Sequence, residues 1–178
     1  MENKERYNHL NEYYKNKFGE RTLKICIDAG FTCPNRDGTL SSSGCIFCSE
    51  KGAGELIKFS KLHISEQVNN FLNSYRGMRA NKFIVYFQNF TNTYDSLENL
   101  KEKYDAALVS DKIVGISIAT RPDCITEDIA KLIASYADKY DVSVELGLQT
   151  SNDNIGRIIN RYYTCLLYTS DAADDRIS

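Results

Sequence analysis

The fold of this chain is limited above all by four apolar runs that alternate with helix-patterned segments. A first helix is expected over residues 5–18. The expected strands are then 22–29, 82–90, 113–120 and 142–150, and the expected helices are 65–78, 96–108, 126–140 and 152–160. This succession is typical of a parallel sheet whose strands are joined by right-handed helical crossovers.

Each expected strand has one apolar face and one face of small or polar side chains. In the first strand the two sets are Leu23, Ile25 and Ile27 against Lys24, Cys26 and Asp28. A doubly wound sheet buries both of its faces and is usually apolar throughout. A barrel with a polar interior would show the division seen here, with polar groups near the carboxyl ends of the strands. We therefore predict an α/β fold, a partial TIM-type (β/α) barrel truncated after about four βα units.

The composition excludes several classes of protein. The 178 residues are 42% hydrophobic and 26% charged, which is ordinary for one globular domain with a core. The net charge of −2 lacks the basic excess of a nucleic-acid-binding surface. We find no apolar stretch long enough for a bilayer and no signal-peptide core. A cytoplasmic location is therefore expected, where the six cysteines stay reduced and serve metal or catalytic roles.

The last residues differ from the rest of the chain. The segment from Cys165 to Asp174 resembles the in-frame translation of a transposase adapter used in DNA library preparation. A natural amphipathic tail is the alternative. On the adapter reading, the chain divides into an N-terminal helical segment (1–20), an incomplete core domain (21–163) and a non-native tail (164–178). The expectation is then an N-terminal fragment that is itself inactive.

Three cysteines follow the first expected strand within one Gly- and Ser-rich loop. They are Cys33, Cys45 and Cys48, the last two in a Cys-x-x-Cys arrangement. Thiolates favour iron–sulfur or zinc centres, and three of them leave one coordination position open. A structural zinc would need a fourth ligand from Cys26, Cys124 or His63, none of which has the usual spacing. The spacing alone leaves an iron–sulfur cluster, zinc and unliganded thiols all open.

The cysteine loop and three further segments together resemble the radical S-adenosylmethionine enzymes. The loop segment is Ile27-Asp-Ala-Gly-Phe-Thr-Cys-Pro-Asn-Arg-Asp-Gly38. The others, each at the end of a predicted strand, are Tyr86-Phe-Gln-Asn-Phe-Thr-Asn-Thr-Tyr94, Thr120-Arg-Pro-Asp-Cys124 and Glu145-Leu-Gly-Leu-Gln-Thr150. The resemblance covers nearly all of residues 6–161. It is closest to the branch related to the elongator catalytic subunit and to proteins of the YhcC type. The eleven residues between Cys33 and Cys45 exceed the commonest spacing of the family but fit this branch.

The resemblance implies an enzyme with two cofactors. Cys33, Cys45 and Cys48 would ligate three irons of a 4Fe–4S cluster, and the fourth iron would chelate S-adenosylmethionine. The reduced cluster would cleave that cofactor to methionine and a 5′-deoxyadenosyl radical. The cofactor contacts implied by the family are Gln88, Asn89, Thr91, Arg121, Glu145, Gln149 and Arg161. No further catalytic residue is assigned.

Structural roles compete with these assignments. Glu145 faces the predicted barrel interior, where a buried carboxylate needs a partner such as Lys24. Arg121 precedes a proline and could simply tie a loop. Arg161 would pair its guanidinium with a cofactor carboxylate. Cys26 alternates with isoleucines and is expected to be a small buried side chain.

The resemblance also predicts partners. A cluster of this kind needs an electron donor such as flavodoxin or ferredoxin, and the elongator-like branch suggests RNA modification as the activity. The net negative charge of the chain argues against an RNA substrate. The function class that competes with the enzyme is a zinc-stabilised, non-catalytic binding module.

Overall fold

The chain folds around one sheet of four parallel strands. The computed structural model describes residues 7–50, 52, 57 and 61–167. The strands are β1 (Thr22–Ile27), β2 (Lys82–Phe87), β3 (Ile113–Thr120) and β4 (Asp141–Leu146), and they lie in the order β1-β2-β3-β4. Strands that are consecutive in the chain are therefore neighbours in the sheet, as in a (β/α) barrel. The predicted α/β fold of partial barrel type is confirmed.

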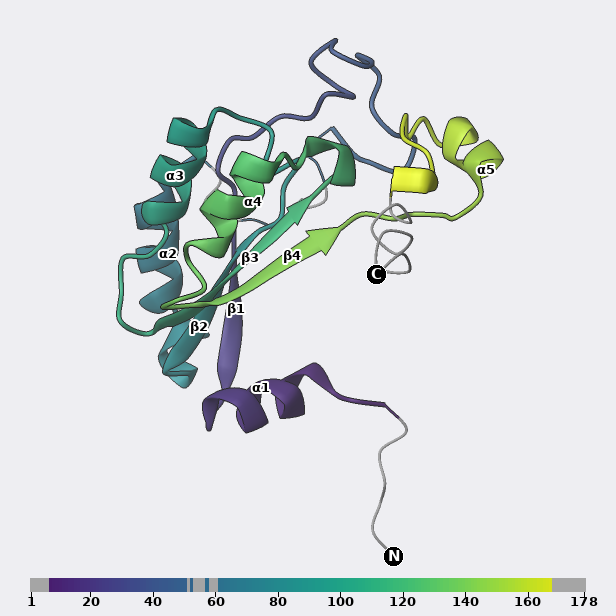
Figure 1. Cartoon of the computed structure of the whole chain (residues 1–178). Coiled ribbons are helices and arrows are strands. Elements are labelled where there is room, and N and C mark those ends of the chain that lie inside the picture. Colours follow the sequence, from purple (N-terminus) through teal and green to yellow (C-terminus); the bar gives the residue numbers. More distant parts are fainter. Residues whose placement is uncertain (1–6, 51, 53–56, 58–60, 168–178) are drawn as a thin grey trace, which may run out of the picture.

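One face of the sheet is covered by the helices that follow the first three strands. These helices are α2 (Ile64–Leu72), α3 (Leu97–Asp105) and α4 (Glu127–Ala134), and Figure 1 shows them side by side on that face. Short 3₁₀ turns at Gly77–Arg79 and Pro122–Cys124 complete two of the connections. The core between the layers contains Phe83, Val85, Phe87, Leu100, Tyr104, Ile116 and Ile118, each at most 1% exposed. Burying each such side chain contributes roughly 1.5–3 kcal/mol.

Polar side chains define where these helices begin. The Ser96 hydroxyl accepts a hydrogen bond from the Asn99 backbone N–H at 3.2 Å and starts α3. The Thr126 hydroxyl does the same for α4 through Ile129 N–H at 3.3 Å. His63 caps the start of α2, and its side chain and that of Glu66 form a reciprocal capping box. Each cap satisfies a backbone donor that the first helical turn leaves unpaired.

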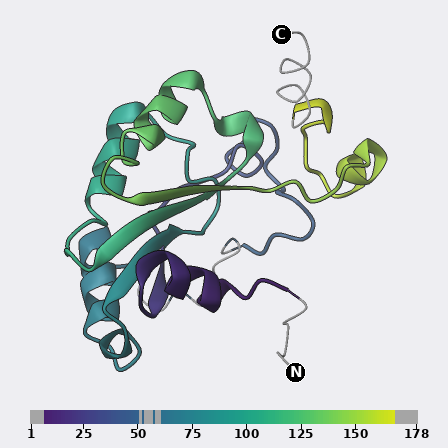
Figure 2. The ribbon, with the colours of Figure 1, turned by 60° about the horizontal axis from the view of Figure 1, so that its bottom comes forward.

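The first helix, α1 (Leu10–Phe18), packs across the end of the sheet where the strands begin. It ends at Gly19, whose φ of +78° is the left-handed conformation that glycine adopts most easily. Tyr14 is its buried contact with the domain. Figure 1 shows α1 beside the start of β1, with the loop after β1 and the last helix at the opposite end; Figure 2 brings α1 to the front. The carboxyl ends of the strands are therefore free to form a site.

All of the predicted helices and strands exist, but several end earlier than predicted. Strand β3 has the predicted bounds, whereas β1, β2 and β4 stop at Ile27, Phe87 and Leu146. The residues after β2 and β4 turn sharply because Phe90 and Gln149 have φ values of +61° and +64°. The first predicted helix begins at Leu10 rather than at residue 5; residues 1–6 lie outside the described part. The helix predicted for 126–140 ends at Ala134 and continues as turns.

Strand β4 is an edge strand and is poorly covered. The predicted apolar face is present, but Val144, Leu146 and Leu148 are 38%, 47% and 44% exposed. Helix α5 (Asp153–Ile158) lies beyond the carboxyl end of β4 instead of packing along it (Figure 1). Cys26 is exposed on the open face of β1, so the prediction that it is buried is wrong. No helix within the described ranges has the length and apolarity needed to cross a membrane.

Candidate functional site

A cavity of about 310 Å³ lies at the carboxyl ends of the strands. This volume is at the low end of the range of about 300–1,000 Å³ for small-molecule sites. The cavity brings together the three cysteines and six of the seven predicted cofactor contacts, namely Cys33, Cys45, Cys48, Gln88, Thr91, Arg121, Glu145, Gln149 and Arg161. Asn89 is the exception among the predicted residues. The site therefore forms where the strand-end segments meet.

The loop after β1 brings its three cysteines to the same cavity. Cys33, Cys45 and Cys48 are each partly buried. The Cys48 N–H donates to the Cys45 carbonyl at 3.0 Å, which closes a tight turn between these two residues. Burial raises the pKa of the Cys45 thiol; the Asn35 hydrogen bond and the Arg121 charge oppose this rise, whereas Cys33 and Cys48 add to it. Cys33 and Cys48 are thus close enough to Cys45 to affect its thiol.

The turn after Cys33 fixes the two later cysteines. The Asn35 amide nitrogen lies 3.2 Å from Cys45 Sγ. The Arg36 guanidinium donates to the Cys48 carbonyl at 2.8 Å and also to the Ser49 carbonyl. Gly44 has a φ of +73°, and a Cβ there would meet the Arg36 guanidinium at 3.2 Å. Sequence reasoning missed Asn35 and Arg36 as site residues, although both lie inside the quoted Cys-Pro-Asn-Arg-Asp-Gly segment.

The donor set suits a soft metal, but the described residues hold no preassembled metal site. Sulfur ligands favour iron–sulfur clusters and zinc. However, no group of three or more His, Cys, Asp or Glu side chains within residues 7–50, 52, 57 and 61–167 is arranged to hold a metal ion. Binding would have to draw the thiols together. The chemistry of the donors therefore fits a thiolate-bound metal, while their present positions do not yet match its coordination geometry.

The candidate fourth ligands for zinc are dispersed. Cys26 is exposed on β1, and His63 caps α2. Cys124 borders a separate hollow with Pro34, Tyr94 and Asp123. Cys33 still influences the Cys124 thiol, but burial first and the Asp123 charge next raise the pKa of Cys124 to about 12. A metal bound at Cys124 would have to displace this thiol proton, as it would at Cys45.

The two arginines of the cavity are held by protein groups. Arg121 is 8% exposed and forms a two-point ion pair with Asp123, at 2.9 and 2.7 Å. Burial alone would lower the pKa of Arg121, but the Asp123 hydrogen bonds and charge raise it above its ordinary value. Arg161 is 1% exposed; it bonds Asp153 at 3.1 Å and the Leu148 carbonyl at 3.0 Å, and it also bonds the Thr150 carbonyl. Arg121 also donates to the Arg161 carbonyl at 3.1 Å, so both arginines tie the strand-end loops together at the wall of the cavity.

Glu145 joins the four strands on the open face of the sheet. Its carboxylate accepts hydrogen bonds from Lys24 at 2.7 Å, Tyr86 at 2.7 Å and Ser117 at 2.9 Å. Burial alone would raise the pKa of Glu145, but these three donors, Lys24 first, lower it below its ordinary value. The predicted pairing with Lys24 is confirmed, but the Glu145 side chain is 42% exposed rather than buried. Glu145 also lines the cavity.

The segment after β2 divides into a cavity wall and a buried support. Gln88 and Thr91 line the cavity, and the Thr91 N–H donates to the Thr32 carbonyl at 3.2 Å. Asn89 is instead 3% exposed and donates to Asp28 Oδ2 at 2.9 Å, so it ties the β1 loop to the β2 loop. The structure thus gives Asn89 a supporting contact outside the cavity lining.

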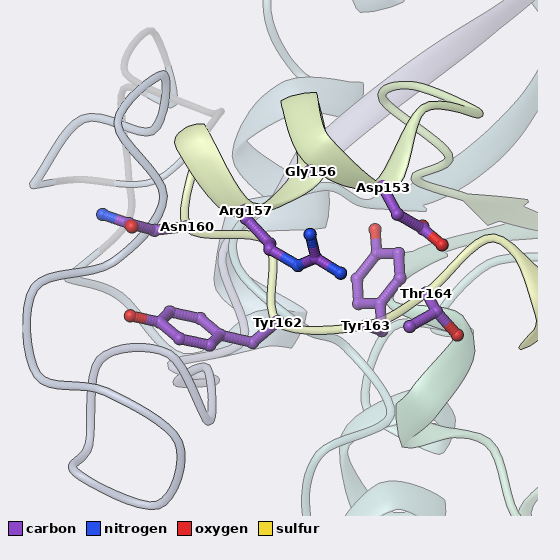
Figure 3. Close-up of a pocket in the computed structure, with 7 residues that line it drawn as sticks. All are labelled: Asp153, Gly156, Arg157, Asn160, Tyr162, Tyr163 and Thr164. Atoms are coloured by element: carbon purple, nitrogen blue, oxygen red, sulfur yellow. The ribbon is translucent and has the colours of Figure 1, made fainter.

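A smaller hollow of about 220 Å³ lies beside the main cavity, around α5. Figure 3 shows Arg157 extending toward the Tyr163 ring, while Asn160 and Tyr162 point the other way. Asn160 and Tyr162 have φ values of +57° and +65°. Tyr163 borders both hollows, and the Arg121 and Arg161 guanidinium groups lie 4.8 and 4.6 Å from its ring centroid. The segment from 160 to 163 therefore closes one side of the site.

Comparison with known proteins finds relatives of about twice this length. The chain is 41% identical over 157 residues to the "Uncharacterized protein YtqA" of Bacillus subtilis, covering 88% of this chain and 49% of that protein. It is 34% identical over 163 residues to "Protein YhcC" of Escherichia coli K12, covering 90% and 52%. It is 35% identical over 152 residues to the "Uncharacterized protein MJ0486" of Methanocaldococcus jannaschii, covering 84% and 46%. The chain thus spans about half the length of the curated relatives it matches.

These findings correct the family prediction. No family model matches the chain. The relatives carry names that state no activity, and the described residues contain no preassembled cysteine cluster. The assignment of the chain to the radical S-adenosylmethionine enzymes is therefore wrong, although the similarity to YhcC itself is present. The adapter-like tail falls largely on residues 168–178, which lie outside the described residues.

Proposed function

We propose that the cavity is a cofactor site in which Cys33, Cys45 and Cys48 ligate a 4Fe–4S cluster and the adjoining space receives S-adenosylmethionine. The observation that carries the proposal is that one cavity is lined by all three thiols and by the polar ends of three strands. The proposal rests on this geometry and on sulfur chemistry, not on membership of a family. Three thiolates leave one iron without a protein ligand, and that iron can bind a second cofactor.

The chain's own residues would prepare this site in three ways. The Asn35 hydrogen bond and the Arg121 charge already oppose the rise in the Cys45 pKa that burial causes. Gln88, Thr91 and Gln149 present polar groups at the cavity wall for a small polar ligand. Phe47 and Leu146 add apolar surface that would limit water. When bound and reduced, the cluster would supply the electron that cleaves the sulfonium bond of S-adenosylmethionine.

The partners of such a site follow from its chemistry. A low-potential electron donor of the flavodoxin or ferredoxin type would have to reduce the cluster. The substrate class stays a prediction: RNA modification came from the resemblance alone, and a net charge of −2 does not favour an RNA-binding surface. The enzyme activity is proposed for a protein as long as these relatives, and this chain covers about half of that length.

The decisive experiment is anaerobic reconstitution of the full 178-residue chain with iron and sulfide. We expect roughly four irons and four sulfides per chain and a brown absorbance that dithionite bleaches. Replacing Cys33, Cys45 or Cys48 with alanine should lower the iron content and change the electron paramagnetic resonance spectrum. Cys26→Ala is the matched control, because Cys26 is a free cysteine outside the cavity. Equal iron in all four variants would overturn the proposal.

The second candidate is a zinc-stabilised binding module without catalysis. The observation in its favour is that Cys33 lies near enough to Cys124 to affect its pKa, so a fourth thiol is within electrostatic reach. Zinc binding at Cys124 would have to remove a thiol proton whose pKa is raised to about 12. Metal analysis separates the two functions: a colourless chain with one tightly bound zinc, lost in Cys124→Ala, would establish the zinc module instead.

A further inference from the structure

We propose that Asn35 is a positioning residue for Cys45, whose sulfur it holds through an amide N–H···S hydrogen bond. The inference rests on the proposed thiolate site and assigns it a residue outside the ligand set. The Asn35 side chain is 0% exposed and lines the cavity. Its amide nitrogen lies 3.2 Å from Cys45 Sγ.

The surroundings of Asn35 determine which way its amide points. The amide nitrogen lies 2.8 Å from the Asn160 carbonyl oxygen and 3.4 Å from the Arg161 carbonyl oxygen. Carbonyl oxygens only accept, so the group facing them must be the donor. The amide oxygen has no hydrogen-bond partner in the described part of the chain. A flipped amide would set oxygen against two carbonyls and a sulfur, which fixes the N–H toward Cys45.

The second contact of Cys45 explains why a donor is needed. Cys45 Sγ lies 3.4 Å from the Asn160 carbonyl, which the thiol hydrogen can reach. Metal binding removes that hydrogen and leaves a sulfur anion beside a carbonyl oxygen. The Asn35 N–H remains and supplies a charge-assisted hydrogen bond to the sulfur. Asn35 therefore keeps Cys45 in place as a metal ligand and also links the cysteine loop to the segment after α5.

Hydrogen-bond donors to a ligand sulfur change the properties of a metal site as well as orienting its ligands. Loss of a hydrogen bond to a ligand typically weakens metal affinity 10–100-fold. A hydrogen bond to a ligand sulfur also lowers the energy of its lone pair. Sulfur-to-metal charge transfer should therefore shift to longer wavelength when the Asn35 N–H is removed. A purely structural asparagine would not produce that spectral change.

The test is titration of the metal-free full chain with cobalt(II), read from its thiolate-to-cobalt charge-transfer absorbance. Asn35→Ala should bind cobalt 10–100-fold more weakly, with the band at longer wavelength. Asn35→Asp keeps the shape but loses the donor, and it should be at least as weak. Asn99→Ala, an exposed asparagine on α3, is the control. Circular dichroism confirms that each variant is folded.

A measurement on the unaltered chain covers the case in which the Asn35 variants fail to fold. In the cadmium-113-loaded chain, the Asn35 amide protons should show scalar coupling to the metal through the sulfur. Wild-type affinity and spectrum in folded Asn35→Ala, or no coupling in the cadmium-loaded chain, would overturn the role of Asn35 alone. A wild-type chain without any charge-transfer band would instead overturn the thiolate site itself.

Discussion

Single residues around the cavity adopt backbone conformations that side chains disfavour. Phe90, Gln149, Asn160 and Tyr162 all have positive φ values, and the first two line the cavity. An L-residue pays roughly 1–2 kcal/mol for the left-handed region. Such residues often gather at functional sites, where the surrounding structure holds them in place. Here they turn the chain sharply after β2, β4 and α5, which aims three loops at the three cysteines.

Gln149→Gly should make the chain more stable and its proposed site weaker. The substitution removes the left-handed cost of about 1–2 kcal/mol, and the greater freedom of glycine in the unfolded chain offsets about 0.5–1 kcal/mol of it. The side chain is exposed, so little burial is lost. Urea denaturation should show a net gain of about 0.5–1 kcal/mol, and the reconstituted chain should bind S-adenosylmethionine more weakly.

The control for this prediction is Asn99→Gly on α3, where the backbone is helical. It should destabilise the chain by about 0.3–0.5 kcal/mol, because glycine is a poorer helix former than asparagine. A loss of stability in Gln149→Gly as large as in this control would contradict the proposed strain.

At the level of elements, polar side chains on the open face connect the strands. Lys24, Tyr86, Ser117 and Glu145 come from β1, β2, β3 and β4 in turn, and Glu145 accepts from the other three. Ser143 adds a hydrogen bond to Ser117 at 2.9 Å. This network positions β4, whose side chains have few buried contacts, at the edge of the sheet. It also places a carboxylate at the wall of the cavity.

The Glu145 network predicts a pH dependence of stability. Its pKa is lower in the folded chain than the ordinary value of 4.5. The unfolded chain therefore binds more protons in that region, and folding is favoured as pH rises through it. The contribution of Glu145 should be complete above about pH 4.5 and lost as pH falls further.

Chemical denaturation between pH 3 and 7 measures this dependence. Glu145→Gln should lose less stability on acidification than the wild type, because its side chain no longer titrates. Glu102→Gln, at an exposed position on α3, should follow the wild-type curve. Identical dependence of stability on pH in all three chains would show that Glu145 does not contribute to it.

At the level of the whole molecule, the sheet is covered on one face and open at β4. The helices bury the apolar face of β1, β2 and β3, while Val144, Leu146 and Leu148 stay exposed. In the sheet formed by the described residues, β4 lies at the end of the strand order and pairs on one side with β3. An exposed apolar edge strand is a site for pairing with another chain.

The 178-residue chain is therefore expected to self-associate as its concentration rises. Val144→Lys places a charge on the edge strand and should reduce the apparent mass measured by light scattering. Leu97→Lys, at an equally exposed apolar residue on α3, should leave association unchanged. A wild-type chain that stays monomeric at millimolar concentration would show that the β4 edge does not pair.

The alternation of apolar runs was sufficient to predict a parallel α/β sheet, since period-2 and helical patterns report local burial. The same alternation predicted the bounds of β3 to the residue. The three cysteines were expected to lie together because they share one loop at the end of a strand, where the loops of such a sheet converge. The ends of β2 and β4 were missed, since positive φ at Phe90 and Gln149 leaves no signal in hydrophobicity. The exposure of Val144 was missed too, because burial depends on which helix packs where.

What the residues alone determined is the fold class, which follows from local pattern. Thiolate chemistry at the three cysteines follows from side-chain type and stays a prediction. What only the tertiary structure decided is how the polar groups are used. In the folded chain Arg161 bonds backbone carbonyls and Asp153, and Asn89 bonds Asp28 outside the cavity lining. Asn35 donates to Cys45. These contacts join residues far apart in the chain, such as Asn35 and Asn160. Their physical origin is the meeting of separate loops at one edge of a sheet, which no local pattern encodes.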